Sequence, residues 1–348
     1  MMDFNFLECL SNADSIASNE QEVRNLLKEK LSVYKDTFQY DGLGSLILTK
    51  KSKVPNAKTV MFAAHMDEVG FMVRYISDIG FAYLMPIGGV EDRAKSMQMV
   101  RVKTQNGNKI RGLLNVTFNS NHEVDQMYVD FGFNTKQEVL NTGVDVGDMI
   151  CFDSEYKELT DVDVFAGKAL DDRVGCWSLA QAMLDIFDKE VNVNVVAAFT
   201  SSEEVGTRGG KLVTNVIKPD IFFAIDVAKN PELDRGYTNT RKLGHGPMLE
   251  FFDKTMVPNP RFLQYVTNLA KKNGLQYQKD MFKGGGTDAG LAHLQYEGIS
   301  SIVIGIPLRY CHDPYSFANK KDLVVAKNLI ECIALNIEEN SIRKIYKF

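Results

Sequence analysis

The spacing of apolar residues near the start of the chain predicts a helix. In the segment EVRNLLKEKL, residues 22–31, apolar side chains recur at three- and four-residue intervals, as they do on one face of an α-helix. Ser18 stands three residues before Gln21, an arrangement typical of a capping box at a helix N-terminus. We therefore expect a capped helix that begins just after Ser18.

A change of pattern divides the next part of the chain. The apolar run TVMFAAHMD, residues 59–67, predicts a fully buried strand that ends at polar side chains. From about residue 71 to about residue 163, short strand-like segments alternate with turn signals such as the glycines at 88 and 89. This second stretch predicts a small β-rich module.

After residue 163 the sequence alternates between strand-like and helix-like segments. The strands are expected in VNVNVVAAFT (191–200), DIFFAIDV (220–227) and ISSIVIGIP (299–307), and the helices in DDRVGCWSLAQAMLDIF (171–187), from Asn259 and Pro260 to Gly274, and in LVVAKNLIECIALNI (323–337). Such alternation predicts an α/β layered sheet. The strand at 59–64 would join these later strands. We therefore predict one discontinuous α/β domain, residues 1–70 and 164–348, interrupted by the β-rich insertion 71–163.

Composition narrows the class of protein. The 348 residues are 45% hydrophobic, enough for large cores, and the formal net charge of -5 offers no basic field for nucleic acid. No apolar stretch approaches the roughly 18 residues of a membrane span, and the first residues lack the order of a secretory signal. The cysteines are odd in number and scattered, without a C-x-x-C pair. We expect a cytoplasmic protein with reduced thiols and no membrane or nucleic-acid partner.

Polar side chains follow the predicted strands. In an open α/β sheet the ligand site lies beyond the carboxyl ends of the strands. The residues found at these ends, or at the start of the helix after the insertion, are His65 and Asp67, Asp171 and Asp172, Glu203 and Glu204, Asp226, and His312. Imidazole and carboxylate without sulfur suit zinc, cobalt or manganese, and the set is large enough for two divalent ions that share a carboxylate. Two ions activate water for hydrolysis of an inert bond such as an amide.

The adjacent acids Glu203 and Glu204 offer two roles. Neighbouring residues in a turn point in different directions, so one carboxylate can bind metal while the other shuttles protons. The pair alone is weak evidence, because adjacent acids on a loop are usually just solvated, and the same holds for Asp171 with Asp172, which also make a good helix start. Their convergence at predicted strand ends is what favours a site.

The histidines differ in their surroundings. His65 precedes Asp67 by two residues, and that carboxylate is well placed to accept the second ring N–H and fix the tautomer. His312 lies in a loop beyond a strand, and both of these histidines are predicted ligands. His122 and His245 have no comparable acidic neighbours and are predicted at the surface. His293 is predicted to be a packed or half-exposed helical side chain.

The segment GGGTDAG, residues 284–290, allows two interpretations. Its glycines would let backbone N–H groups approach a ligand closely, or would simply form a flexible entry into a helix. The order of Lys and hydroxyl residues found in a phosphate loop is missing. Gly285 and Thr287 are our candidate substrate contacts in this segment, together with Arg309 elsewhere in the chain.

Six motifs in one order resemble the M42 family of metallo-aminopeptidases, which includes glutamyl aminopeptidases of lactic bacteria and the tetrahedral TET peptidases. They are AHMDEVGF, GKALDDRVG, TSSEEVGTRGG, AIDV, GGGTDAG and IGIPLRYCHDP, and the resemblance runs from about residue 20 to about residue 340. It implies a phosphorylase/hydrolase-like αβα sandwich with an inserted β-barrel dimerisation domain. It also implies peptide substrates and twelve-subunit tetrahedral particles.

The resemblance also implies individual roles. Asp171 would bridge the two ions, with His65 and Asp226 completing one site and Glu204 and His312 the other. Glu203 would be the general base, Asp67 would orient His65, and Asp172 would follow Asp171 through an unusual peptide geometry. One departure is that Cys311 and Asp313 flank His312 where relatives often have Ile and Ser. The added acid leaves the metal identity open, and the thiol of Cys311 could compete as a ligand.

Substrate preference and reaction class remain open in the sequence. We expect a preference for an amino-terminal Glu or Asp first, and a broad or aliphatic preference second. A preference for Glu or Asp needs a cation in the pocket that receives the first side chain. The candidate cations are Lys254, Arg235, Arg241, Lys283 and Arg309. An N-acyl amidohydrolase would use the same metals. Some relatives are labelled endoglucanases, but a glycosidase has no use for the two histidines. A non-catalytic scaffold would not need all five ligands and the base.

Overall fold

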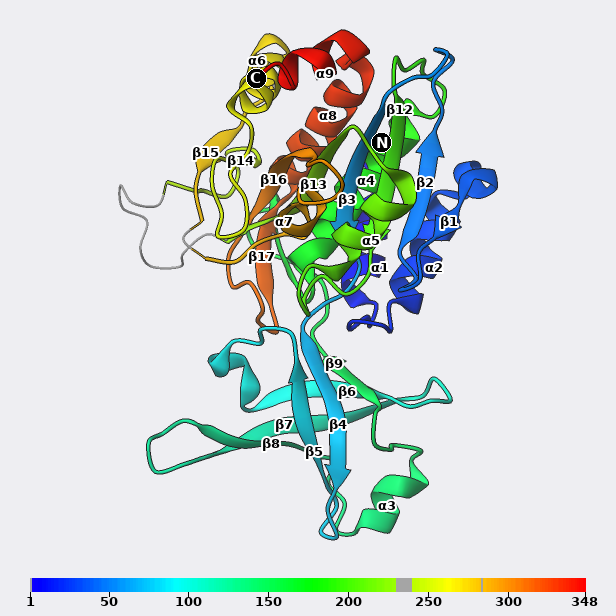
Figure 1. Cartoon of the computed structure of the whole chain (residues 1–348). Helices are drawn as coiled ribbons and strands as arrows, with labels where there is room; N and C mark the ends of the chain where they lie inside the picture. Colours follow the sequence, from blue (N-terminus) through cyan, green and yellow to red (C-terminus); the bar gives the residue numbers. More distant parts are fainter. Residues whose placement is uncertain (1, 230–239, 283) are drawn as a thin grey trace.

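A computed structural model describes residues 2–229, 240–282 and 284–348 of the chain. Figure 1 shows an α/β domain above a narrower β-barrel, with both chain termini in the α/β domain. The helices are α1 Phe4–Asn12, α2 Gln21–Lys30, α3 Lys136–Asn141, α4 Leu170–Ile186, α5 Arg208–Ile217, α6 Pro260–Lys272, α7 Asp288–Ala292, α8 Lys320–Asn336 and α9 Glu339–Ile345, with the 3-10 turns η1 Ser32–Thr37 and η2 Asp92–Lys95. None of these helices in the described ranges has the length and apolar character needed to cross a membrane.

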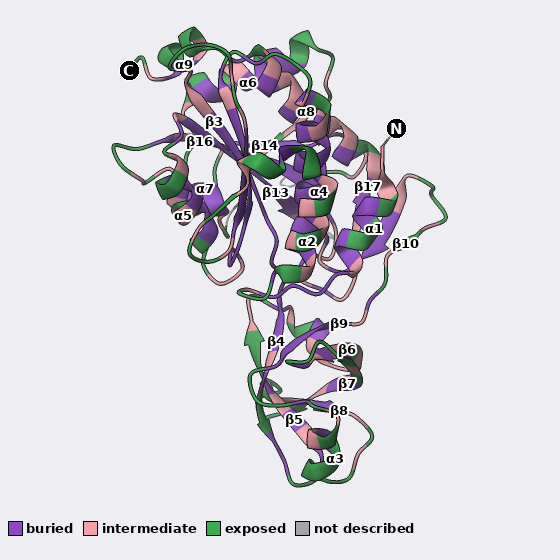
Figure 2. Cartoon of the chain, turned by 90° about the vertical axis from the view of Figure 1, so that its right-hand side faces the viewer, coloured by how far each residue is buried: buried purple, intermediate pink, exposed green. Residues whose placement is uncertain are grey.

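Eight strands of the described residues form the main sheet, in the order β1-β2-β12-β3-β13-β16-β14-β15. Their bounds are β1 Gln39–Tyr40, β2 Leu46–Lys50, β12 Asn194–Thr200, β3 Thr59–His65, β13 Ile221–Lys229, β16 Ser300–Leu308, β14 Met248–Glu250 and β15 Gln278–Asp280. The central strands β12, β3, β13 and β16 are parallel. Because parallel strands are covered on both faces, they read as continuous apolar runs, and Figure 2 shows them buried at the centre of the domain.

Two helical layers cover the sheet. Alternate residues of β12, such as Val195 and Ala197, pack into the large core with α4, α6 and α8, and the residues between them, such as Val196, pack into a smaller core under α5 and α7. Trp177 of α4 is fully buried, stacks on Phe4 at 5.0 Å between ring centroids, and donates its ring N–H to a backbone oxygen. The predicted αβα sandwich is confirmed.

The second domain is a closed barrel in the strand order β4-β5-β8-β7-β6-β9. Its strands are β4 Gly70–Ile76, β5 Phe81–Ile87, β6 Gln98–Lys103, β7 Lys109–Phe118, β8 Val124–Asp130 and β9 Met149–Phe152. It has its own apolar core, in which Phe71 and Phe152 meet edge to face. The next strands, β10 Lys157–Glu158 and β11 Val164–Gly167, pair instead with β17 Ser316–Asn319 in a three-stranded sheet.

Local predictions at helix ends were partly right. The helix α2 is confirmed, but the capping box was wrong, because the helix begins after Glu20 and has no side-chain cap. Ser18 instead has a positive φ of 68°, and its backbone N–H donates to the Glu20 carboxylate, so the chain turns once more before it becomes helical. At α6, by contrast, the Asn259 side chain accepts the backbone N–H groups of Arg261 and Phe262, as expected of a helix start.

The three histidines predicted away from the site lie as expected. His122 is exposed at the turn between β7 and β8, with a φ of 62°, and His245 is exposed in the loop before β14. His293 follows α7 half-buried, with its Nδ1 3.1 Å from the Ala289 carbonyl oxygen.

Candidate metal centre

The register of the central strands brings the first group of site residues to one level of the sheet. Thr200, the last residue of β12, pairs with His65, the last residue of β3. The pairing of β13 with β3 ends at Ala224 and Ala63, so two more residues bring Asp226 level with His65. The sequence suggested that Asp226 lies at the end of its strand. This was wrong, because β13 continues along β16 to Lys229.

Asp171 lies where three other candidates meet. One carboxylate oxygen, Oδ1, is 3.1 Å from Nε2 of His65, and the other, Oδ2, is 3.3 Å from Nε2 of His312. The same His312 nitrogen is 3.4 Å from Oε2 of Glu204. Asp171 stands at the entrance to α4 with non-helical backbone angles, and the peptide bond to Asp172 is cis, the unusual geometry that the family resemblance implied.

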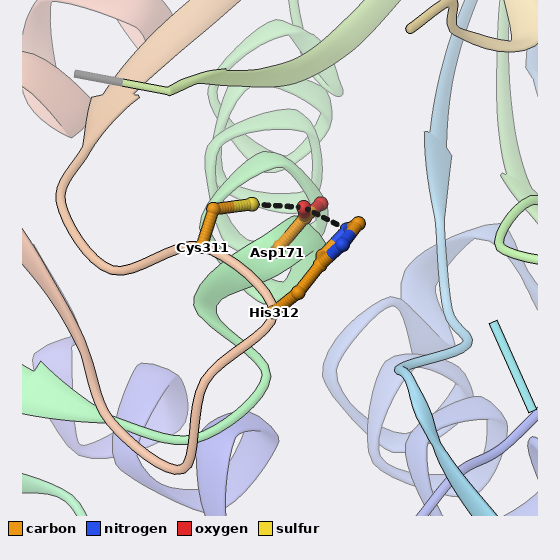
Figure 3. A group of neighbouring side chains, drawn as sticks. All are labelled: Asp171, Cys311 and His312. Carbon is orange, nitrogen blue, oxygen red and sulfur yellow. Dashed lines mark hydrogen bonds and ion pairs between the residues drawn. The ribbon is translucent and has the colours of Figure 1, made fainter. Parts of the chain in front are cut away.

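The loop between β16 and β17 delivers His312 to this cluster. Figure 3 shows His312 and Cys311 approaching the carboxylate of Asp171 from neighbouring positions of that loop. The Cys311 thiol donates to Oδ2 of Asp171 at 2.8 Å. The second ring nitrogen of His312 lies 3.0 Å from the carbonyl oxygen of Gly89, in the insertion, so a backbone group of the β-rich module orients this ring.

Asp313, the acid that departs from the family pattern, does not add a free charge beside His312. Its two carboxylate oxygens accept hydrogen bonds from Arg93 of η2, at 2.9 Å from Nε and 2.5 Å from Nη2. Its side chain therefore fastens the His312 loop to the insertion.

Asp67 contacts both halves of the cluster, but not as the sequence suggested. The nearer acceptor to Nδ1 of His65 is the backbone carbonyl oxygen of Asp67, at 3.0 Å, and the carboxylate lies 3.5 Å away. The carboxylate instead accepts the backbone N–H groups of Glu203 and Glu204, at 2.9 and 3.0 Å. It thus fixes the turn that carries the paired glutamates.

Burial and neighbouring charges shift the pKa values of the acids in the site. Burial raises the pKa of Glu204 to about 7, with His312 opposing and Asp171 adding to the rise. Burial and the charge of Asp171 raise the pKa of Asp226 to about 8, and burial raises the pKa of Glu203 well above its usual range. Burial alone would raise the pKa of Asp171 too, but its hydrogen bonds with His312 and His65 hold it well below the ordinary value.

These residues fit a centre for divalent cations. The cluster holds two imidazoles and four carboxylates, those of Asp171, Glu203, Glu204 and Asp226, a donor set suited to zinc, cobalt or manganese. Oε1 of Glu204 is buried with no hydrogen-bond partner among the described residues. Donor atoms of His65, Asp171 and Glu204 lie within 4.8 Å of one another, and so do those of Asp171, Cys311 and His312.

A cavity of about 470 Å³ opens over the cluster. Asp171, Glu203, Glu204, Asp226 and His312 all line it, and so do two predicted substrate contacts, Gly285 and Thr287. Arg309 is not among the lining residues and pairs through its backbone with Phe317. Two buried acids that sequence reasoning missed, Glu250 and Asp253, also line the cavity; Glu250 ends a three-residue strand and Asp253 follows it, with no motif to mark either.

Sequence reasoning also missed a buried ion-pair group around Glu68. Its two cations, Lys168 and Arg173, stand on either side of Asp171 in the chain, so the group supports the segment that carries Asp171. Glu68 accepts hydrogen bonds from Lys168 at 2.8 Å and from Arg173 at 3.0 Å, and all three side chains are buried. Asp14 and Cys151 are close to Glu68, but Lys168, also 3.2 Å from Asp14, already balances these acids. This group is therefore an ion-pair network rather than a second metal site.

Replacing Glu68 by Gln should lower the stability of the protein by about 3–5 kcal/mol, because it leaves Lys168 and Arg173 buried without a full counter-charge. Urea unfolding of the metal-loaded variant measures this. Glu190→Gln, which breaks an exposed pair with Lys53, is the control and should leave the unfolding curve unchanged. Equal curves for both variants would contradict the role given to Glu68.

Comparisons with known proteins identify the family to which this sequence is similar. Residues 44–329 match the model of the M42 glutamyl aminopeptidase family. Curated relatives include a putative aminopeptidase of Acetivibrio thermocellus, 34% identical over 95% of this chain and 98% of that protein. A glutamyl aminopeptidase of Lactococcus lactis is 31% identical over 99% of both chains, and a lysyl aminopeptidase of Pyrococcus furiosus is 28% identical over 95% and 97%.

Solved structures agree with the sequence relatives. A TET aminopeptidase from a marine-sediment Thaumarchaeota archaeon superposes with a TM-score of 0.93 at 29% identity, covering 98% of this chain and 99% of that one. The TET1 peptidase of Pyrococcus horikoshii, described as able to assemble into a tetrahedron or a large octahedral shell, gives 0.86 at 27% identity over 96% and 99%. Fold and site together define a hydrolase of the aminopeptidase class. The chain belongs to the M42 peptidase family.

Proposed function

We propose that the protein is a two-metal aminopeptidase that removes the amino-terminal residue of peptides. The observation that carries this proposal is the meeting of two imidazoles at the two oxygens of Asp171, with Glu204 against one of these imidazoles, beneath a cavity that Glu203 also lines. Asp171 would be shared by both ions. His65 and Asp226 would complete one site, and Glu204 and His312 the other.

The metals would supply charge that polarises the scissile carbonyl and lowers the pKa of a water toward neutrality. Asp67 holds Glu203 and Glu204 in one turn by accepting both backbone N–H groups, which lets their carboxylates serve different purposes. Glu203 would take a proton from the attacking water and return it to the leaving amine. Zinc, cobalt and manganese all suit the ligands.

Two alternative reactions are less well supported. A glycosidase requires a pair of carboxyl groups but no imidazole, whereas both histidine rings here contact Asp171. An N-acyl amidohydrolase would use the same residues and differs only in taking a substrate whose amine is blocked. The match to the family model over 44–329 favours the free amine.

The residue preference expected from sequence, Glu or Asp first, depends on a cation near the first pocket. Of the candidates, Lys254 is exposed and does not line the cavity, and Arg309 does not line it either. Arg241 lies 3.5 Å from Asp280. Arg235 and Lys283 lie outside the described residues. The relatives differ among themselves, being named for glutamyl and for lysyl substrates, so the preference has to be established for this chain.

Assembly and location form the remaining part of the proposal. The similarity to TET peptidases supports a homo-oligomer, for which we propose barrel-mediated dimers that build a tetrahedral dodecamer. We place the protein in the cytoplasm because all five cysteines are free thiols.

Metal-stripped protein should recover cleavage of aminoacyl-nitroanilides when cobalt, zinc or manganese is added, because the catalytic water depends on the ions. Initial rates on a panel of amino acids measure this, and blocked N-acetyl analogues serve as the control. Cleavage of only the blocked compounds would support the amidohydrolase, and silence on both with metal bound would support a scaffold.

A further inference from the structure

The cavity over the metal cluster continues to the end of β14, where Glu250 and Asp253 line it. In the sheet, Met248 of β14 pairs with Gly305 of β16, and Gly305 pairs with Asp226 of β13. Glu250 lies two residues beyond Met248, and side chains two apart on a strand share a face. Glu250 and Asp226 therefore lie on the same face of the sheet, and both line one cavity.

The Glu250 carboxylate makes no hydrogen bond with the described residues. The side chain is fully buried, and neither carboxylate oxygen has a hydrogen-bond partner there. Asp253 is 2% exposed and uses Oδ1 for the N–H groups of Thr255 and Met256, but its Oδ2 is also unpartnered. Burial raises the pKa of Glu250 to about 9, the charges of Asp253 and Asp226 add to the rise, and the charge of Arg241 opposes it. Such buried, unpartnered acceptors are costly unless a ligand satisfies them.

Of the described cations near the cavity, Arg241 and Lys229 each contact another acid, and the charge of Arg241 also acts on Glu250. Nε of Arg241 lies 3.5 Å from Oδ2 of Asp280, and its guanidinium packs 4.6 Å from the ring centroid of Phe282. Lys229 is paired with Glu91 of the insertion. With metal ions balancing the acids of the catalytic cluster, Glu250 and Asp253 offer buried carboxylate oxygens to a cation, whose charge would stabilise the ionised form of Glu250.

We propose that Glu250, assisted by Asp253, determines specificity by receiving the basic side chain of an amino-terminal Lys or Arg. This inference rests on the proposed aminopeptidase function, and it replaces the acidic preference that sequence alone suggested. An amino-terminal residue whose amine is held at the metal cluster extends its side chain into this same cavity. Phe282 provides an apolar wall for the methylene groups of such a side chain, and the two acids receive its charged end.

Kinetics with nitroanilides of Lys, Arg, Leu and Glu test the proposal. Wild-type metal-loaded protein should give the highest kcat/KM with Lys or Arg and the lowest with Glu. Glu250→Gln, which keeps the shape of the side chain and removes its charge, should lower the Lys-to-Leu ratio of kcat/KM at least tenfold. Glu190→Gln removes the same charge from the surface and should keep the wild-type ratio.

Binding provides a readout that does not depend on turnover. L-lysine and L-norleucine have the same four-carbon side chain, but only lysine carries the terminal ammonium group. Calorimetry should show at least tenfold tighter binding of lysine by the wild-type protein, and this difference should disappear in Glu250→Gln. Thermal melting and metal content of the variant establish that it is folded and loaded.

The outcomes separate this inference from the proposed function. Preferential cleavage of Glu or Leu substrates, or an unchanged Lys-to-Leu ratio in Glu250→Gln, would overturn the specificity proposal and leave the aminopeptidase intact. Failure to cleave any of the four nitroanilides, together with lysine binding that Glu250→Gln abolishes, would overturn the peptidase function and keep the cation pocket.

Discussion

Replacing Glu203 by Gln is expected to lower kcat for aminoacyl-nitroanilides by about 1,000-fold or more, while metal content remains at the wild-type level. The amide of Gln keeps the size of the side chain but cannot accept and return a proton. The Glu203 backbone would stay in place, because its N–H donates to Asp67 and does not depend on the side chain. Single-turnover kinetics and elemental analysis of the same preparation measure the two quantities.

Glu204→Gln provides the matched control for Glu203→Gln. The two residues are adjacent, both are held through their backbone by Asp67, and only Glu204 lies within 3.4 Å of His312. We expect Glu204→Gln to lose bound metal and activity together. If Glu203→Gln lost metal and Glu204→Gln retained it, the roles of the two glutamates would be exchanged.

The sequence predicted which residues converge where they lie close to strand ends. His65 ends β3, and the glutamate pair follows β12 by three and four residues, so the fold brings them together at the edge where parallel strands finish. The buried apolar runs identified those strands without knowledge of their neighbours. The order of the strands in the sheet was not predictable from the pattern, because parallel pairing depends on contacts between distant segments.

The unpredicted features depend on such distant contacts. The sequence marked Asp313 only as an added acid beside His312, but the fold brings Arg93 of the insertion against it. Gly89, read only as a turn signal, supplies the carbonyl oxygen that faces His312. Glu250 stands out because it is buried and makes no hydrogen bond with the described residues, and burial on a three-residue strand has no periodic signature. The insertion thus contributes directly to the geometry of the metal cluster.

Removal of the metals should destabilise the protein, and more strongly at pH 8.5 than at pH 5.5. Without ions, the carboxylates of Asp171, Glu204 and Asp226 face one another in a buried space, and the pKa values of Glu204 and Asp226 rise to about 7 and about 8. Unfolded carboxyl groups titrate near pH 4, so between pH 4 and pH 8 the folded metal-free protein binds more protons than the unfolded chain. Its stability therefore falls as pH rises through this window.

The two histidines also make the metal-free protein less stable as pH rises over this range. Their acidic neighbours raise the pKa of His65 and of His312 although burial opposes the rise, so the stability they contribute is complete below about pH 6.5 and is lost above it. Asp171 has a lowered pKa and loses its contribution only in acid below the usual carboxyl range, outside the interval considered. Bound ions occupy the carboxylate and imidazole groups that would otherwise hold these protons. Protons therefore compete with the ions, and metal binding weakens at low pH.

Thermal melting of stripped and reloaded protein between pH 5.5 and pH 8.5 measures this effect. We expect the difference in Tm to widen by roughly 5 °C or more across the range, since one extra proton bound by the folded state changes stability by about 1.4 kcal/mol per pH unit. Asp226→Asn removes one of the titrating carboxyls, so its metal-free form should show a shallower dependence on pH. A difference that stays constant, or narrows toward pH 8.5, would mean that these acids are not held together in the metal-free fold.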